Sequence, residues 1–321
     1  MNQTIFLMLG LLGLVGIGAA VSGNDDDHPP EGPADDPRLE FDEDTAIGDD
    51  DCNDDQVVTG TDGIDFIQGG DGNDTLNGLA GNDGFRPGDG DDVISGGAGD
   101  DGIRGEDGDD TIDGGEGDDL VGAGYGDDSV VADVGDDSIY LGSGDDIYGA
   151  DAPGVNEGND TIYAGYGDDT ITTNLGNHSI EGFDGNDEIR DYGGSVYING
   201  EADNDLIVSP DASDPEAVDT LIGGEGADTI HAGAGDLVDP GTGSDVIMLR
   251  SDAGGAADIT YGGADSITIT LAADYTGEAS YELVQDGEDV RLVVDGVDLA
   301  ILRATNVADV DSISLVREAV E

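Results

Sequence analysis

Aspartate recurs every nine residues through the middle of the chain, each time two residues before a large apolar side chain. From Gly60 to Gly149 the sequence divides into ten nine-residue units without a gap, and the sixth residue of every unit is Asp, from Asp65 to Asp146. Carboxylate and carbonyl oxygens are the ligands that hard cations such as Ca²⁺ prefer. Carboxylates repeated at one position of stacked units would repel one another unless a cation lay between them. The acidic column therefore favours cations as partners.

Two more columns show which elements must position these aspartates. The fourth residue of each of the ten units is Gly, from Gly63 to Gly144, and the eighth is apolar or aromatic, from Ile67 to Tyr148. A period of nine fits neither an α-helix nor a simple alternating strand, and a fixed short period indicates a solenoid. We expect each unit to form a six-residue loop and a three-residue strand, with the eighth residue pointing inward.

The repeats become less regular after residue 149. A five-residue insertion at 150–154 precedes six more units over 155–208, which keep Ile at position eight but carry His178 and Val196 in place of two aspartates. A second insertion at 209–213 precedes irregular units that include 223–231 and 240–248. The apolar column thus outlasts the carboxylate column.

The units resemble those of the repeats-in-toxin (RTX, haemolysin-type) family, whose pattern is Gly-Gly-x-Gly-x-Asp-x-U-x with U a large apolar residue. GGDGNDTLN at 69–77 and GGEGDDLVG at 114–122 match it at every fixed position. The resemblance implies an all-β parallel β-roll, a β-solenoid with two units per turn, and multiple Ca²⁺ ions between loops 18 residues apart. Asp65 would then share an ion with Asp83, and Asp74 with Asp92, while sites around His178 and Val196 would be weak or empty.

The ligands that the resemblance implies are the position-six aspartates together with loop carbonyls. These metal-site residues are Asp65, Asp74, Asp83, Asp92, Asp101, Asp110, Asp119, Asp128, Asp137, Asp146, Asp160, Asp169, Asp187, Asp205, Asp228 and Asp245. Acids at position five, such as Asp91 and Asp109, allow two interpretations, a solvated outer face or further ligands. We favour the solvated face.

The charge balance restricts the partners of this protein. The chain has 77 Asp and Glu against 8 Lys and Arg, a formal net charge of −69. Binding of nucleic acid or of an anionic lipid surface needs the opposite sign of charge. A compact state of this composition would repel itself. We therefore expect calcium ions as partners and hypothesise that folding depends on them.

Motifs for other functions are not found in the sequence. Cys52 is the single cysteine and three histidines are scattered, so neither a disulfide framework nor a Cys/His zinc site is expected. The chain contains neither a His-Glu-x-x-His nor a Gly-x-Ser-x-Gly motif, and we predict that it is not an enzyme. The main interpretation is a secreted calcium-binding structural protein.

The alternative interpretation is an ancillary carbohydrate-binding or adhesion module of an extracellular enzyme system. Its partner would be a surface polysaccharide or a component of the cell envelope. Tyrosines near the middle of the roll could stack on sugars, although we favour the simpler view that they cover a thin sheet. They are Tyr125, Tyr140, Tyr148, Tyr163 and Tyr166.

The regions outside the repeats predict export and a cap. Residues 1–22 contain an apolar run over 5–21 and are predicted to be a cleaved signal peptide or a retained membrane anchor. Either would place the acidic body at an extracellular or cell-surface location, with membrane contact only through an uncleaved segment. Residues 23–55 are predicted to be an acidic, proline-containing linker, residues 56–248 the roll, and residues 249–321 a C-terminal antiparallel β cap. For the last region the resemblance also suggests a secretion signal.

Overall fold

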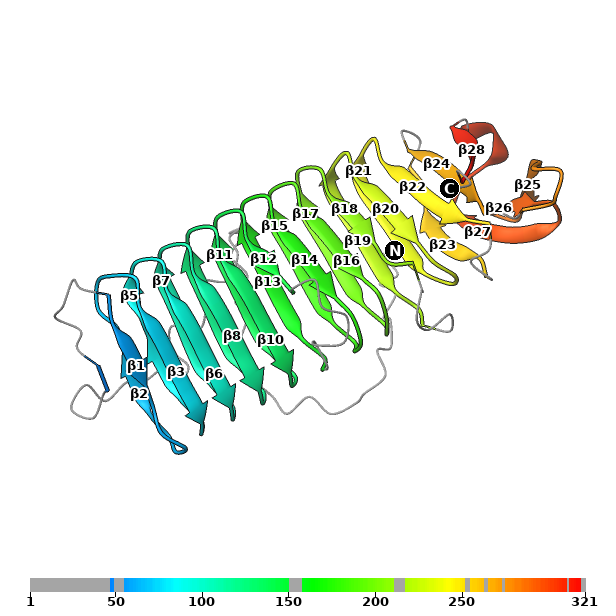
Figure 1. Cartoon of the computed structure of the whole chain (residues 1–321). Helices are drawn as coiled ribbons and strands as arrows, with labels where there is room; N and C mark the ends of the chain where they lie inside the picture. Colours follow the sequence, from blue (N-terminus) through cyan, green and yellow to red (C-terminus); the bar gives the residue numbers. More distant parts are fainter. Residues whose placement is uncertain are drawn as a thin grey trace, which may run out of the picture.

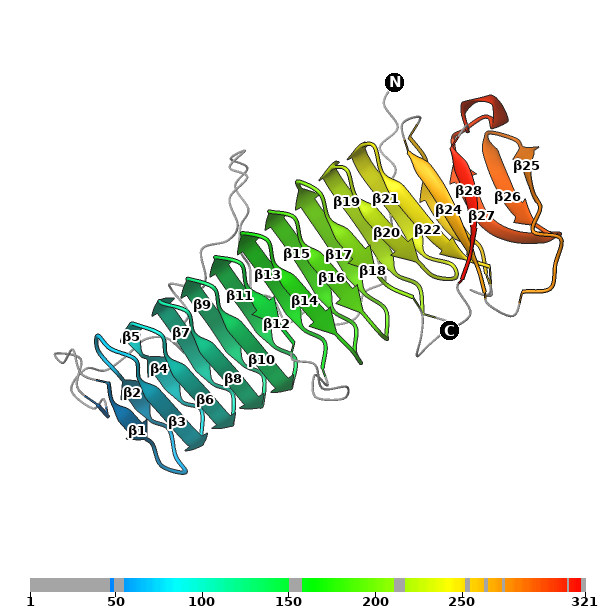
Figure 2. The same cartoon turned by 45° about the horizontal axis from the view of Figure 1, so that its top comes forward.

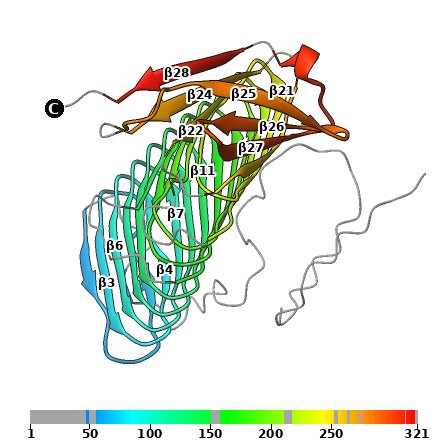
Figure 3. The same cartoon turned by 90° about the vertical axis from the view of Figure 1, so that its right-hand side faces the viewer.

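The computed structural model describes residues 47–48, 55–149, 158–210, 217–251, 255–262, 265–272, 275–310 and 312–318. Two long sheets face each other along an elongated solenoid, with β1 and β2 at one end and β25 to β28 at the other (Figure 1, Figure 2). Seen from the end that carries β25 to β28, the turns follow one another as a stack of flattened loops (Figure 3). This arrangement confirms the predicted all-β parallel roll.

In the described residues the first sheet has 13 strands. In sheet order they are β1 (Val57–Thr59), β3 (Thr75–Ala80), β6 (Val93–Ala98), β8 (Thr111–Glu116), β10 (Ser129–Val134), β12 (Ile147–Tyr148), β14 (Thr170–Thr173), β16 (Glu188–Asp191), β18 (Leu206–Val208), β20 (Thr229–Ala232), β22 (Val246–Arg250), β24 (Ser266–Leu271) and β28 (Ile313–Arg317).

The second sheet has 15 strands over the same ranges. In sheet order they are β2 (Phe66–Gln68), β4 (Gly84–Arg86), β7 (Gly102–Asp107), β9 (Leu120–Tyr125), β11 (Ser138–Ser143), β13 (Thr161–Tyr166), β15 (Ser179–Asp184), β17 (Tyr197–Ala202), β19 (Thr220–Gly226), β21 (Leu237–Gly243), β23 (Ala257–Thr260), β27 (Val297–Arg303), β26 (Asp289–Val294) and β25 (Tyr281–Asp286), with β5 (Gly88–Asp89) paired to β7. One 3₁₀ turn, η2 (Val307–Asp309), precedes β28.

The position-eight side chains form two ladders that make the core between the sheets. Ile94 pairs with Ile112 in the first sheet and Ile103 with Val121 in the second, so one turn takes 18 residues. All four are at most 1% exposed. Because successive side chains of a strand point to opposite faces, position eight faces inward while positions seven and nine face outward.

The predicted insertions leave these ladders intact. Across the first insertion the pairing offset rises from 18 to 23 residues, as between Ile139 and Ile162, and it does so again between Ile198 and Leu221. Each predicted insertion lies wholly or partly outside the described residues. The ladders therefore continue in register on both sides of each insertion.

The strands are longer than the three residues expected. Strand β8 covers positions seven to nine of one unit and positions one to three of the next, and Gly115 at position two pairs with Asp133 of β10. Position two takes a positive φ, 106° at Gly115, so the strand bends there without losing its neighbour. The prediction was wrong because pairing between identical turns extends past the bend.

The position-four glycines are required by the stacking of the turns. Gly108 has a φ of 143°, and a Cβ built on it would lie 2.0 Å from the carbonyl oxygen of Gly90, one turn earlier. Only glycine combines that backbone conformation with such a close approach. This column therefore sets the distance between successive loops.

The C-terminal part closes the roll at one end. β25, β26 and β27 pair antiparallel, which confirms the expected antiparallel strands. Parallel pairing continues past residue 248, since β27 also pairs with β23 and β28 with β24. Arg303 on β27 donates to Asp289 of β26 at 2.9 Å and also pairs with Asp258 of β23. The added strands cover the last edge of the sheet, which would otherwise be open to pairing.

The predicted signal peptide or anchor at 1–22 lies outside the described residues, as does most of the predicted linker. Within the ranges that the structure does describe, no helix has the length and apolar character needed to cross a bilayer.

Candidate metal centre

The position-six residues line up in two columns, one on each edge of the roll, where a loop enters a strand. Edge A leads into the 15-stranded sheet, and edge B leads into the 13-stranded sheet. Edge A consists of Asp65, Asp83, Asp101, Asp119, Asp137, Asp160, His178, Val196, Asp219 and Asp236. Edge B consists of Asp74, Asp92, Asp110, Asp128, Asp146, Asp169, Asp187, Asp205, Asp228 and Asp245.

Backbone hydrogen bonds hold each carboxylate against the preceding turn. The N–H of Asp65 donates to Oδ1 of Asp83 at 2.8 Å, and that of Asp74 donates to Oδ1 of Asp92 at 2.7 Å. The same bond links Asp119 to Asp137 at 2.8 Å. The structure therefore brings together the pairs that the sequence predicted to share an ion.

The second oxygen of most of these carboxylates is buried and has no partner. Among the described side chains, Oδ2 is unpaired in fourteen aspartates, namely Asp74, Asp83, Asp92, Asp101, Asp110, Asp119, Asp128, Asp137, Asp146, Asp169, Asp187, Asp205, Asp228 and Asp245. Each of these residues is at most 3% exposed. An unpaired buried carboxylate oxygen is strongly unfavourable, so a repeated set of them indicates a missing counter-charge.

Burial changes the acidity of these groups in a consistent direction. Removal from water is the largest cause and raises the pKa, the backbone hydrogen bond to Oδ1 lowers it, and neighbouring carboxylates raise it again. The pKa rises to about 8 for Asp110 and Asp119 and to about 7 for Asp92 and Asp128. Bound protons or bound cations can both supply the positive charge that the columns lack.

Backbone oxygens are available beside the carboxylates. The carbonyl oxygen of Gly72 would lie 2.3 Å from a Cβ on Gly90, so the loops of successive turns come close together along the edge. In the described part of the chain, no three His, Cys, Asp or Glu side chains gather as a metal site. A cation held here would take carboxylate oxygens of position six with loop carbonyls. This all-oxygen set fits Ca²⁺, which tolerates adaptable geometry.

The position-five acids lie outside these columns. The N–H of Asp109 donates to Oδ1 of Asp91 at 3.2 Å, and the N–H of Asp127 donates to Oδ1 of Asp109 at 3.0 Å. All three side chains are exposed. Here the N–H of the later turn donates to the carboxylate of the earlier turn, which is the reverse of the position-six bonds. The position-five side chains face solvent.

Sequence reasoning missed two buried aspartates of edge A. Asp219 and Asp236 are each at most 1% exposed and directly precede β19 and β21. The N–H of Val196 donates to Oδ1 of Asp219 at 3.0 Å, and that of Asp219 donates to Asp236 at 3.1 Å. Neither has the glycine pattern before it. The sequence signal that could have identified these two aspartates is the Asp-x-apolar triplet, which occurs as Asp219-Thr220-Leu221 and as Asp236-Leu237-Val238.

Three of the five tyrosines lie in the core or stack on another ring. Tyr148 is fully buried at position eight, so it belongs to the core and is not available to a sugar. Tyr140 and Tyr163 stack on the outer face of the second sheet with ring centroids 5.0 Å apart, and Phe183 follows at 6.3 Å from Tyr163. Because these rings lie against one another, much of their face area is already covered. The polysaccharide partner stays a prediction.

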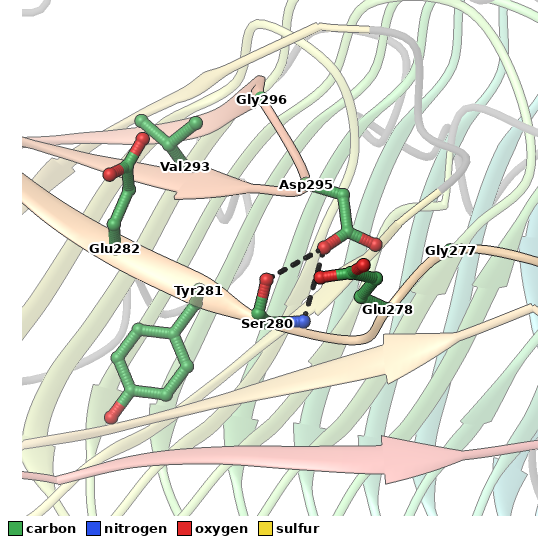
Figure 4. A pocket seen from close by; sticks show the side chains of 8 residues that line it. All are labelled: Gly277, Glu278, Ser280, Tyr281, Glu282, Val293, Asp295 and Gly296. Carbon is green, nitrogen blue, oxygen red and sulfur yellow. Dashed lines mark hydrogen bonds between the residues drawn. The ribbon is translucent and has the colours of Figure 1, made fainter.

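A hollow lies in the cap and has a different character from the carboxylate columns. About 600 Å³ in volume, it is lined by Gly277, Glu278, Ser280, Tyr281, Glu282, Val293, Asp295 and Gly296 (Figure 4). Asp295 accepts hydrogen bonds from the Ser280 backbone at 3.2 Å and hydroxyl at 2.9 Å, and it also accepts one from Tyr275. The Tyr275 hydroxyl, the largest cause, and Ser280 lower the pKa of Asp295 to about 2. This carboxylate is thus occupied in ordering its own loop.

The fold and the two columns define a parallel β-roll with carboxylate-lined edges. The model of the RTX calcium-binding nonapeptide repeat matches residues 53–85, 87–121, 122–152, 155–177, 181–209 and 216–247. The chain belongs to this family, and its repeats are of the calcium-binding type.

Comparison with whole proteins adds less. No curated protein matches the chain. Among solved structures, the chain is similar to the extracellular lipase LipA from Serratia marcescens, at 15% identity and a TM-score of 0.22. The match covers 80% of this chain and 39% of the lipase chain, so this chain spans well under half of that protein's length.

Proposed function

We propose that this chain is a secreted, non-catalytic structural protein whose roll folds around Ca²⁺ held between stacked loops. The ligands are the sixteen position-six aspartates predicted from the sequence, with loop carbonyls. The observation that carries the proposal is the set of fourteen buried carboxylates whose Oδ2 has no partner among the described residues. A cation between turns would neutralise two such groups at once.

The net charge of −69 supports the same conclusion. Carboxylates stacked one turn apart repel each other strongly at low local dielectric. Ligand binding that occurs only in the folded state adds its free energy to folding. Calcium is therefore a structural component of the roll.

An extracellular location fits this dependence. Extracellular calcium modules bind with dissociation constants of about 10⁻⁴ to 10⁻³ M, concentrations that are met outside cells. The predicted signal peptide or anchor at 1–22 would direct the acidic body there. The proposed organisation keeps 23–55 as linker, 56–248 as roll and 249–321 as cap or secretion region.

Isothermal titration calorimetry of the full chain tests the binding step. The proposal expects several Ca²⁺ ions per chain with millimolar or tighter affinity, and much weaker binding of Mg²⁺, which requires a smaller octahedral site and retains its waters. A chain that takes up no Ca²⁺ at millimolar concentrations would overturn the proposal.

A further inference from the structure

The second carboxylate oxygen of the position-six aspartates has different hydrogen bonding on the two edges of the roll. On edge B, Oδ2 is buried and unpaired in all ten aspartates, from Asp74 to Asp245. On edge A it is unpaired in only four, from Asp83 to Asp137. These ten and four account for the fourteen unpaired groups. We infer that beyond Asp137 edge A is closed by the protein's own hydrogen-bond donors, so that divalent cations bind there along edge B alone. This inference rests on the proposed function and removes Asp160 from the sixteen ligands proposed there.

Asp160 is the first edge A residue after the unpaired series. Its Oδ2 accepts a hydrogen bond from the hydroxyl of Tyr148 at 3.2 Å, inside the core. Its N–H donates to Nδ1 of His178 at 3.2 Å, so the imidazole takes the acceptor role that a carboxylate has in other turns. The substitution removes one negative charge from the column. Asp160 therefore already has the partner that a cation would otherwise provide.

The next two units of edge A compensate for their missing aspartates at another position. Position one is Gly, Ala, Pro, Leu or Val in the other units of 60–149 and 155–208, but it is Thr173 in the unit of His178 and Asp191 in the unit of Val196. Oδ1 of Asp191 accepts from the Thr173 hydroxyl at 2.8 Å, and its Oδ2 accepts from the N–H of Gly193 at 3.1 Å. Both side chains are at most 1% exposed. A direct side-chain bond thus links the two turns where the column of carboxylates is interrupted.

Edge A ends with two further closed carboxylates. Oδ2 of Asp219 accepts a hydrogen bond from the hydroxyl of Ser209, and Oδ2 of Asp236 accepts one from the N–H of Gly233 at 2.6 Å. Their Oδ1 atoms accept the same backbone bonds as in the rest of the column. A carboxylate that accepts bonds at both oxygens is already satisfied and has less need of a cation.

A matched pair of variants tests this difference. Asp205→Asn changes an edge B residue, and Asp219→Asn changes the edge A residue of the following unit. Native mass spectrometry would count the Ca²⁺ ions per chain, and circular dichroism in saturating Ca²⁺ would verify the fold. We expect Asp205→Asn to lose one or two ions, because it faces a turn on each side, and Asp219→Asn to keep the wild-type number. Equal losses from both variants would overturn the inference.

The conservative variant Tyr148→Phe keeps the test decisive if Asp219→Asn does not fold. It removes the hydroxyl bound to Asp160 and leaves the ring in the core. An increased number of ions would support closure of this turn by the hydroxyl, and an unchanged or decreased number would overturn it. If the wild-type chain bound no Ca²⁺ at all, the proposed function itself would be wrong, which is a distinguishable result.

Discussion

The backbone N–H of Asp92 donates a hydrogen bond to Oδ1 of Asp110, the equivalent residue one turn further along edge B, at 2.8 Å. The bond fixes the register of the two loops and leaves Oδ2 of both residues buried without a partner. The same feature that aligns the turns therefore concentrates negative charge between them. Cation binding on this edge follows from the alignment itself.

Replacing Asp110 by Asn should remove calcium binding on both sides of one turn. The amide retains an acceptor for the N–H of Asp92 but loses the charge. Each lost site lowers the free energy of unfolding in calcium by about 2.7 kcal/mol when Ca²⁺ is 100-fold above its dissociation constant. Urea unfolding in saturating Ca²⁺ measures this loss.

The neighbouring substitution Asp109→Asn is the matched control. Asp109 is exposed at position five, and its change should stay within about 0.5 kcal/mol with no loss of ions. Equal effects of the two substitutions would mean that the buried column has no special role in binding.

Acid should partly replace calcium. In the folded metal-free chain the pKa of Asp110 and Asp119 is raised to about 8, against a usual value near 3.9 when unfolded. A raised carboxyl pKa stabilises the fold fully below the unfolded pKa, and this stabilisation is lost as the pH rises through the folded pKa. Metal-depleted protein should therefore gain strand signal in circular dichroism as the pH falls from 8.5 to 5.

The calcium-loaded protein provides the comparison for this experiment. With the columns already neutralised, its strand signal should change little over the same pH range. A metal-depleted chain that loses strand structure on acidification would contradict the assignment of the buried carboxylates as the destabilising groups.

The regular half of the fold was predictable from the sequence because each column has a separate physical requirement. The inward residue typified by Ile112 makes the core, the position-four residue typified by Gly108 allows close stacking, and Asp110 marks the entry to the strand. The 18-residue register and the pairs Asp65–Asp83 and Asp74–Asp92 follow from these columns together with the family resemblance. The structure confirms the register and brings both pairs together.

The second half depends on contacts that a repeat pattern does not contain. The hydroxyls of Tyr148 and Ser209 reach Asp160 and Asp219 across ten or more residues of chain. Asp219 itself has no preceding glycine signal. Whether a carboxylate oxygen is satisfied is decided by such neighbours, and they become apparent only when the turns are stacked.

The position-four glycines should be intolerant of a side chain. Gly108→Ala would place Cβ 2.0 Å from the Gly90 carbonyl oxygen at a φ of 143°, and we expect destabilisation of about 1–3 kcal/mol or more. Gly122→Ala is the control, since nothing lies within 4 Å of its Cβ position. Thermal unfolding in calcium would compare the two. A Gly108→Ala protein as stable as Gly122→Ala would refute the stacking argument.

The inward ladder should carry most of the packing energy. Ile112→Ala removes a side chain that is 1% exposed and should lower the free energy of unfolding by about 2–5 kcal/mol. Val93→Ala, at an outward position 48% exposed, should change it by about 0.5 kcal/mol or less. Urea unfolding in saturating Ca²⁺ would measure both. Similar losses from both would show that the inward ladder contributes no more to stability than the outward positions.

Far-ultraviolet circular dichroism of the full chain at pH 7.5 tests the central claim most directly. The net charge of −69 and the unpaired buried carboxylates predict little strand signal in EDTA and a cooperative rise to full strand content as Ca²⁺ is added to millimolar concentration. Full strand signal in EDTA, unchanged on adding Ca²⁺, would contradict the claim that calcium provides the charge on which this fold depends.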